Sequence, residues 1–299
     1  MSIEVKNITK VYGEQKALND ISFKIGSGEI VGFLGPNGAG KSTMMKILTC
    51  YIPQSQGEAK VCGLNTLEDT IPIREKVGYL PEHNPLYLEM YVLEYLEFIA
   101  GIHKSAKDRI SEMIEKTGLS PEKHKKIGQL SKGYRQRLGL AAALIHDPEV
   151  LILDEPTTGL DPNQLVEIRN LIKEIGAKKT VMLSTHIMQE VEMLCNRVII
   201  INKGKIVADR PTSDLQNFKK SKSFTIEFEE DVQKNQLKKI EGVKEVKAIS
   251  DRKWLLHSVG EEDIRTHIFQ FAVEQKLTIL EIKQEAQKLE EIFQELTKS

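Results

Sequence analysis

One short stretch, from Gly35 to Thr43, limits what this chain can fold into more than any other part of it. It reads Gly-Pro-Asn-Gly-Ala-Gly-Lys-Ser-Thr and fits the phosphate-binding pattern G-x-x-x-x-G-K-[ST] at every fixed position. The apolar run Ile30–Leu34 before it is typical of a buried strand, and the apolar residues from Met44 to Ile52 follow helical spacing. A glycine-rich turn with a chance Lys-Ser is the alternative, but the flanking strand and helix favour a nucleoside-triphosphate site between them.

Each residue type in this loop suits a polyphosphate. The glycines allow the backbone to curl with its N–H groups pointing inward, and a helix that starts near Lys41 adds the positive end of its dipole. Lys41 would reach the β- and γ-phosphates of the nucleotide, the Ser42 hydroxyl would be a ligand of Mg²⁺, and Thr43 would support a neighbouring phosphate oxygen. The predicted nucleotide-binding residues of the loop are therefore Gly35, Pro36, Asn37, Gly38, Ala39, Gly40, Lys41, Ser42 and Thr43.

Two adjacent carboxylates end a second buried strand. The apolar run Val150–Leu153 leads directly into Asp154 and Glu155, which is the pattern of a strand that delivers acids to a site at its carboxyl end. Asp154 would hold the Mg²⁺ shell through water, and Glu155 would orient and partly deprotonate the attacking water. Two acids in this position could also cap a helix, but the phosphate loop upstream favours catalysis.

The order of strands and helices predicts two unequal domains. Residues 1–217 alternate strands and helices around the phosphate loop, with a helical insertion at about 86–147. A polar, lysine-rich linker follows, and residues 218–299 show the order β-α-β-β-α-β, similar to a small α+β, ferredoxin-like unit. This second part contains no metal-ligand spacing or glycine-rich loop, so we expect a regulatory or docking role for it. Its predicted helices include one through Val232, Leu237 and Ile240 and a final one striped by Leu289, Ile292, Phe293 and Leu296.

Composition and charge limit the cellular compartments and the classes of partner that we expect for this chain. The formal net charge is -1, so no global positive field attracts nucleic acid, and we expect no nucleic-acid partner. The cysteines Cys50, Cys62 and Cys195 lack the short paired spacing of a zinc site and fit a reducing compartment. The N-terminus does not resemble a signal peptide, and no apolar stretch approaches the ~18 residues that a bilayer span requires. We therefore expect a cytoplasmic protein whose role at a membrane depends on a partner.

A further block, from Leu130 to Gly133, makes the pattern more specific. It fits Leu-Ser-x-Gly, its serine lies 23 residues before Asp154, and Glu155 follows directly after that aspartate. Together with the phosphate loop, these features resemble the ATP-binding cassette of ABC transporters over about residues 1–217. The resemblance implies an α/β P-loop ATPase core with a mixed sheet and a helical subdomain.

The resemblance also implies roles that the pattern alone leaves open. Tyr12 would stack on adenine, although an aromatic at a strand end is as readily explained by packing. His186 would contact the γ-phosphate, although a single histidine after a strand is more often structural. Asp161 would belong to a loop that bridges two subunits, and Ser131 and Gly133 would reach the ATP held by the other protomer. The family thus implies an ATP-dependent homodimer that uses ATP and Mg²⁺ and attaches to an integral permease on the inner face of the cell membrane.

Two positions depart from the family pattern. The signature block reads Leu-Ser-Lys-Gly-Tyr in place of Leu-Ser-Gly-Gly-Gln, and the loop after Tyr79 carries Glu82 where the family has glutamine. A carboxylate at Glu82 could still offer an oxygen to Mg²⁺, but it adds charge. Export-type cassettes with Leu-Pro-Glu at this place are similar, and the stretches Gly78–Tyr87 and Leu130–Arg137 resemble the gliding-motility-associated ABC ATP-binding subunit.

Three classes of function compete at this level. The first is an ATPase subunit that powers a permease, the second a soluble ABC protein that acts on ribosomes, DNA or another non-transport machine, and the third a non-catalytic module. Ribosomal members usually carry two cassettes, and DNA-repair members need a coiled coil or zinc-bearing insertion between Lys41 and Asp154, whereas this chain shows one phosphate loop and neither insertion. The presence of Lys41, Asp154, Glu155 and His186 argues against a non-catalytic module, so the ATPase subunit is favoured.

The stretch Glu82–Tyr91 is the predicted docking site of the permease. It crowds large apolar and aromatic side chains together without the period of a buried helix or strand, so some of them should face outward as anchors for a partner. The alternative is that they pack against the helix that follows. The side chains concerned are Leu86, Tyr87, Leu88, Met90 and Tyr91.

Overall fold

A computed structural model describes residues 1–215, 222–260 and 263–285, and the chain divides into two compact units between Thr212 and Ser213. This boundary lies a few residues before the predicted one at 217. Each unit has its own buried apolar cluster. None of the helices in the described residues is long and apolar enough to cross a membrane.

The first unit is built on a central sheet that gathers parallel strand ends at one edge. Its strand order is β10-β9-β3-β8-β7-β6, and every neighbouring pair is parallel except β10 with β9. Every residue of β3, β7 and β8 is buried, as expected for parallel strands covered on both faces. The strands are β3 (Ile30–Leu34), β6 (Val77–Leu80), β7 (Val150–Asp154), β8 (Thr180–Thr185), β9 (Arg197–Asn202) and β10 (Lys205–Pro211).

A second, antiparallel sheet in the same unit has the order β2-β1-β4-β5. The helix that follows the phosphate loop, α1 (Lys41–Leu48), contacts β2 and β4 of this sheet and β7 of the central sheet. Its apolar residues Met44, Met45, Ile47 and Leu48 are fully buried in the cluster that the two sheets share. The loop is therefore held between strand and helix, as the sequence predicts. The strands of this sheet are β1 (Ile3–Tyr12), β2 (Gln15–Ile25), β4 (Gln56–Val61) and β5 (Leu64–Asn65).

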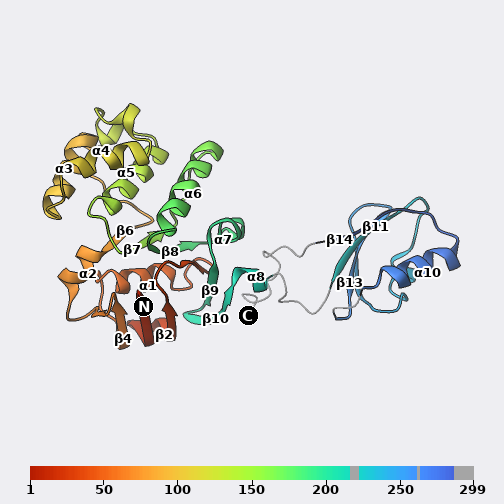
Figure 1. Ribbon diagram of the computed structural model, residues 1–299. Coiled ribbons are helices and arrows are strands. Elements are labelled where there is room, and N and C mark those ends of the chain that lie inside the picture. Colours follow the sequence, from red (N-terminus) through yellow and green to blue (C-terminus); the bar gives the residue numbers. More distant parts are fainter. Residues whose placement is uncertain (216–221, 261–262, 286–299) are drawn as a thin grey trace. The chain divides into compact units, whose positions relative to one another are not determined.

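The predicted helical insertion is present between β6 and β7. Figure 1 shows α3, α4 and α5 gathered in one group, and α5 packs on β6 of the central sheet. Its helices are α3 (Val92–Ile102), α4 (Asp108–Lys116) and α5 (Lys132–Leu144), with 3-10 turns at Ser120–Glu122 and Ile127–Gln129. The other helices of the first unit are α2 (Thr70–Lys76), α6 (Pro162–Gly176) and α7 (Met188–Leu194), and α8 (Thr212–Leu215) begins at its boundary.

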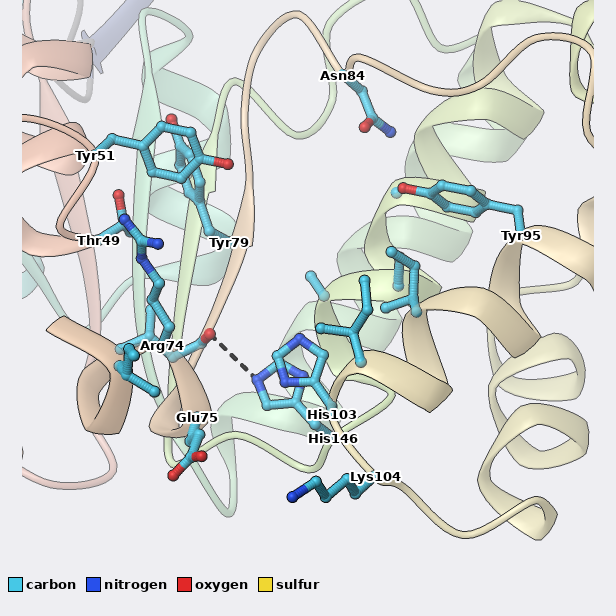
Figure 2. A pocket seen from close by; sticks show the side chains of 17 residues that line it. Thr49, Tyr51, Arg74, Glu75, Tyr79, Asn84, Tyr95, His103, Lys104 and His146 are labelled. Atoms are coloured by element: carbon cyan, nitrogen blue, oxygen red, sulfur yellow. Dashed lines mark hydrogen bonds between the residues drawn. The ribbon is translucent and has the colours of Figure 1, made fainter.

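Two stacked histidines join the helical insertion to the central sheet. The rings of His103 and His146 are nearly parallel, with centroids 3.9 Å apart, and Nε2 of His146 donates to the Val77 carbonyl oxygen at 3.2 Å (Figure 2). Burial, with a smaller contribution from His103, lowers the pKa of His146 to about 4. Burial also lowers the pKa of His103. The folded protein therefore keeps both rings neutral at pH 7.

Because the pKa of His146 is lowered in the folded protein, the free energy of unfolding depends on pH. Between pH 6.5, the ordinary histidine value, and about 4, the unfolded chain binds a proton at residue 146 that the folded chain does not, so the free energy of unfolding falls as the pH falls. The expected loss is on the order of 1 kcal/mol, since solvent reaches this half-buried ring. Thermal melting at pH 7, 6 and 5 should show a shallower decline for His146→Gln than for the wild type. His124→Gln, at an exposed histidine, is the matched control; equal slopes for all three proteins would contradict this account.

The second unit has the predicted β-α-β-β-α-β order. Its strands form one antiparallel sheet in the order β12-β13-β11-β14, with β11 paired to both β13 and β14, which is the split βαβ arrangement. Its elements are β11 (Ser223–Phe228), α9 (Lys234–Leu237), β12 (Val243–Ala248), β13 (Lys253–Ser258), α10 (Arg265–Gln275) and β14 (Ile279–Glu285).

Two helices predicted for this unit from apolar spacing have different outcomes. The helix expected through Val232, Leu237 and Ile240 is only the short α9, although all three side chains are buried in the core. Burial there comes from the loops on either side of α9, so apolar spacing overstated the helix. The final helix predicted from Leu289 to Leu296 lies outside the described residues.

Candidate nucleotide site

The phosphate loop needs glycine for two different reasons. Gly38 and Gly40 have φ angles of +77° and +110°, in the region that side chains rarely adopt. A Cβ on Gly40 would also lie 2.6 Å from the Ala17 carbonyl oxygen. Gly35 has no such angle, but a Cβ there would lie 2.4 Å from the Ile201 carbonyl oxygen. The loop is thus pressed against its own sheet, and its backbone is curled directly before α1 begins at Lys41.

The Lys41 side chain is buried beside this loop, and its ammonium group is held by polar neighbours. Its side chain is 7% exposed, and its Nζ donates to the Gly35 carbonyl oxygen at 2.8 Å and to the Pro36 carbonyl oxygen at 3.3 Å. Burial lowers the pKa of Lys41, opposed by nearby carboxylates, of which Glu155 is the strongest. Its Nζ lies 3.9 Å from Oε1 of Glu155. Backbone carbonyls and one carboxylate therefore hold this ammonium where an anionic phosphate would bind.

The two carboxylates lie where β7 ends, and a serine from the next strand organises them. Ser184 Oγ donates to Oδ1 of Asp154 at 2.5 Å and accepts from the Glu155 N–H at 3.0 Å. No sequence motif assigns a role to Ser184. The sequence shows only that Asp154 and Ser184 each follow a buried apolar run, and the β7–β8 register that pairs them comes from the structure. Glu155 itself has φ +52°, an uncommon backbone conformation that is often found at functional sites.

Glu155 is held by two further side chains. Nδ1 of His186 donates to its Oε2 at 2.9 Å, and Oγ1 of Thr158 donates to the same oxygen at 3.4 Å. Burial raises the pKa of Glu155 above its usual value, against the hydrogen bond from His186, which lowers it. A carboxylate with a raised pKa accepts a proton more readily, so this environment suits a general base. Thr158 is a second residue to which no sequence motif assigns a role.

These groups line one cavity of about 310 Å³. It joins the phosphate loop, the end of β7 and His186, and Glu82 reaches it from the loop after β6. Amide and ammonium donors thus face a group of carboxylate and hydroxyl oxygens, which is an arrangement suited to a polyphosphate with a hard divalent cation. The lining residues are Ala17, Asn37, Gly38, Gly40, Lys41, Ser42, Thr43, Glu82, Asp154, Glu155, Thr158 and His186.

Seven predicted site residues lie outside this lining, and three of them, Gly35, Pro36 and Ala39, belong to the phosphate loop itself. Tyr12, at the end of β1, is 49% exposed, with Nζ of Lys10 at 5.1 Å from its ring centroid. Ser131 is the N-cap of α5, where its hydroxyl accepts from the Tyr134 N–H at 3.3 Å, and Gly133 lies in the first turn. Asp161 is the N-cap of α6 and accepts from the Gln164 N–H at 2.9 Å. Within one copy of the chain, Ser131, Gly133 and Asp161 therefore have no part in the wall of the cavity that holds Lys41.

Comparison with known proteins connects this site to one family. The family model described as "ABC transporter" matches residues 18–158, and a second, described as "AAA domain, putative AbiEii toxin, Type IV TA system", matches residues 126–192. An uncharacterised ABC transporter ATP-binding protein of Bacillus subtilis, YhcH, is 33% identical, covering 99% of this chain and 95% of its own length. The bacitracin transport ATP-binding protein BcrA of Bacillus licheniformis is 39% identical over 72% of this chain and 71% of its own.

A solved structure extends the comparison to the fold. The dimeric post-hydrolysis state of the ATP-binding cassette MJ0796 bound to ADP and Pi superposes with a TM-score of 0.66 at 28% identity, covering 70% of this chain and 98% of that one. The match thus spans about the extent of the first unit, while YhcH matches nearly the whole chain.

Proposed function

This chain belongs to the ABC transporter ATP-binding proteins, a family of ATP-hydrolysing cassettes, and from that premise we propose that two copies close head to tail over two ATP molecules to drive a separate membrane permease. One observation carries the proposal. The cavity with Lys41 and Glu155 lacks, in its own wall, the helix start at Ser131 and Gly133 and the cap at Asp161. A second copy that supplies these groups completes the site, and the solved cassette cited above is dimeric.

In the proposed site, each described contact has a place in hydrolysis. The loop amides and Lys41 bind the phosphates of ATP, so the Lys41 ammonium exchanges its hydrogen bonds with the Gly35 and Pro36 carbonyls for phosphate oxygens. Glu155 takes a proton from the attacking water, and His186 and Thr158 hold its Oε2 in place. Tyr12 offers its half-exposed ring to the adenine.

Mg²⁺ fits the oxygen donors of the same cavity. Ser42, Asp154 and Glu82 all line it, and hydroxyl and carboxylate oxygens are the ligands that this ion prefers. Asp154 is only 2% exposed, with Ser184 fixing one of its oxygens. When bound, the ion neutralises phosphate charge that the single Lys41 ammonium cannot balance alone.

The permease is proposed to dock on the surface formed by Tyr87, Leu88 and Tyr91. These side chains are 58%, 48% and 49% exposed, and exposed aromatic clusters are typical of binding anchors. The packing alternative also has support, since the Tyr87 ring contacts Tyr95 and Phe98 of α3, with centroids at 6.3 and 6.0 Å. Tyr87 therefore rests on α3 and keeps much of its surface free for a partner.

A cavity of about 670 Å³ lies beside this surface, between the helical insertion and the central sheet. Figure 2 shows Tyr51, Tyr79 and Arg74 on one side of it and Asn84 and Tyr95 on the other. The Tyr79 hydroxyl is buried without a hydrogen-bond partner among the described residues.

Replacing Tyr87 and Tyr91 with serine together is expected to release the cassette from membranes while leaving its ATP affinity unchanged. Loss of two aromatic anchors should weaken docking by at least about 30-fold. Co-sedimentation with membranes that contain the permease measures the first effect, and ATP titration of the purified protein measures the second. Phe269→Ser, at a 64% exposed aromatic in the second unit, is the matched control. Retained membrane association with a lowered melting temperature would favour packing on α3 instead.

Export is the proposed direction of transport, because the chain carries Leu-Pro-Glu after Tyr79, as similar export-type cassettes do. BcrA is named as a bacitracin transport protein. We propose a cytoplasmic cassette held at the inner face of the membrane by its permease. The narrower gliding-motility assignment stays a prediction, because none of the relatives cited above is named for it.

A further inference from the structure

The first turn of α5, which carries Gly133 of the signature block, packs closely on the first turn of α6. A Cβ on Gly133 would lie 2.0 Å from Oε1 of Gln164, 2.7 Å from its Cδ and 2.9 Å from its Nε2. A side chain at position 133 would therefore require the flexible end of the Gln164 side chain to move. Gly133 has no positive φ angle, so its lack of a side chain serves this close approach rather than a special backbone turn.

Gln164 contacts Asp161 as well as Gly133. Asp161 Oδ1 accepts from the Gln164 N–H at 2.9 Å, and the Asp161 N–H donates to Oε1 of Gln164 at 3.5 Å, which together form a capping box at the start of α6. One side chain therefore bridges the signature glycine and the aspartate of the loop after Glu155.

Neighbouring residues repeat this contact between the same two segments. The Lys132 side chain lies over Gly159, where a Cβ would meet its Nζ at 2.5 Å and its Cε at 2.6 Å. One turn further along α5, Arg137 forms an ion pair with Glu167 of α6 and donates to the Thr117 carbonyl oxygen at 3.2 Å. The first turns of α5 and the segment from Gly159 to Glu167 are thus joined at three successive places.

We propose that Gln164 is a positioning residue that fixes the signature block to the loop carrying Asp161, so that both reach the partner's ATP as one unit. The inference rests on the proposed head-to-tail dimer, in which both segments face the other protomer. It assigns Gly133 a function separate from any contact with phosphate, since a side chain at 133 would push Gln164 away and disturb the Asp161 cap.

This proposal and the phosphate-contact explanation of Gly133 predict different outcomes for a pair of changes. If Gly133 is needed only to approach ATP, Gly133→Ala damages the dimer whatever occupies position 164. If it is needed to admit Gln164, shortening Gln164 makes room for the new methyl group. The two residues then behave as a coupled pair in a double-mutant cycle.

The experiment measures ATP-driven dimerisation by light scattering across protein concentrations, with Mg²⁺ and ATP, in a Glu155→Gln background. We expect Gly133→Ala to raise the dimer dissociation constant by about tenfold or more, Gln164→Ala to raise it about threefold, and the double variant to match Gln164→Ala alone. In the chain with Glu155 intact, Gly133→Ala and Gln164→Ala should each raise the protein concentration that gives half-maximal ATPase activity. The KM for ATP should stay unchanged. A purely structural defect would instead lower the melting temperature of the monomer and its ATP affinity.

Two results would overturn the proposal. A double variant as weak as Gly133→Ala shows that the glycine serves the nucleotide and not Gln164. A Gln164→Ala variant with wild-type dimerisation, half-maximal concentration and KM shows that the bridge positions nothing. Failure of the Glu155→Gln background itself to dimerise with ATP is a different result, which removes the proposed dimer and with it the basis of this inference.

Discussion

Glu155→Gln is expected to bind ATP, lose hydrolysis and accumulate as an ATP-bound dimer. Glutamine has nearly the same shape as glutamate and can keep its place beside His186 and Thr158, but it cannot take a proton from water. Loss of a general base of this kind should lower kcat by about 100- to 10,000-fold. The affinity of the monomer for ATP should stay within about threefold of wild type, because the proposed phosphate-binding groups are Lys41 and the loop amides and not Glu155.

The matched control for this variant is Glu174→Gln, at an exposed glutamate of α6. It makes the same chemical change outside the cavity and should leave kcat unaltered. Hydrolysis by Glu155→Gln at the wild-type rate would show that another group activates the water.

Lys41→Ala is expected to weaken ATP binding, the step that precedes hydrolysis. The variant loses the ammonium that now donates to Gly35 and Pro36 and that would donate to phosphate. Hydrogen bonds to charged groups are worth about 1.5–3 kcal/mol each, so ATP affinity should fall by about 10- to 100-fold, and dimerisation with it. Titration with a fluorescent ATP analogue measures the loss.

Lys46→Ala is the control on the same helix, because Lys46 is exposed and lies outside the cavity. Folding of Lys41→Ala should be intact, since removing a buried charge whose pKa burial already lowers costs the fold little. Wild-type ATP affinity in Lys41→Ala would mean that the loop binds phosphate through its amides alone.

The sequence predicted the parts of the fold that depend on local pattern. Two buried apolar runs, Ile30–Leu34 and Val150–Leu153, correctly predicted β3 and β7. The phosphate loop follows the first run and two carboxylates follow the second, so the sequence also indicated the edge of the sheet where these strands end. The β-α-β-β-α-β order of the second unit could also be predicted, because the alternation of apolar and polar residues is visible even within strands of a few residues. The length of α9 could not, since Val232 and Ile240 reach the core from loops and mimic helical spacing.

The candidate site was harder to predict where it depends on contacts between distant segments. Ser184 and Thr158 touch the two carboxylates only because β7 and β8 are neighbours and the chain turns back after Glu155, and neither residue belongs to a motif. The bridge from Gln164 to Gly133 likewise joins two helices whose approach no spacing in the sequence encodes. The roles of Tyr12, Ser131, Gly133 and Asp161 stay predictions, because they depend on nucleotide and on a second copy.

The most direct test of the head-to-tail dimer is the solution mass of Glu155→Gln with and without ATP and Mg²⁺. Multi-angle light scattering should give the monomer mass of 33.8 kDa without nucleotide and twice that mass with it. Adding Ser131→Arg should keep ATP binding and return the mass to that of the monomer, because the site on each protomer needs the signature of the other. The same mass with and without ATP, or a dimer that survives Ser131→Arg, would contradict the composite site.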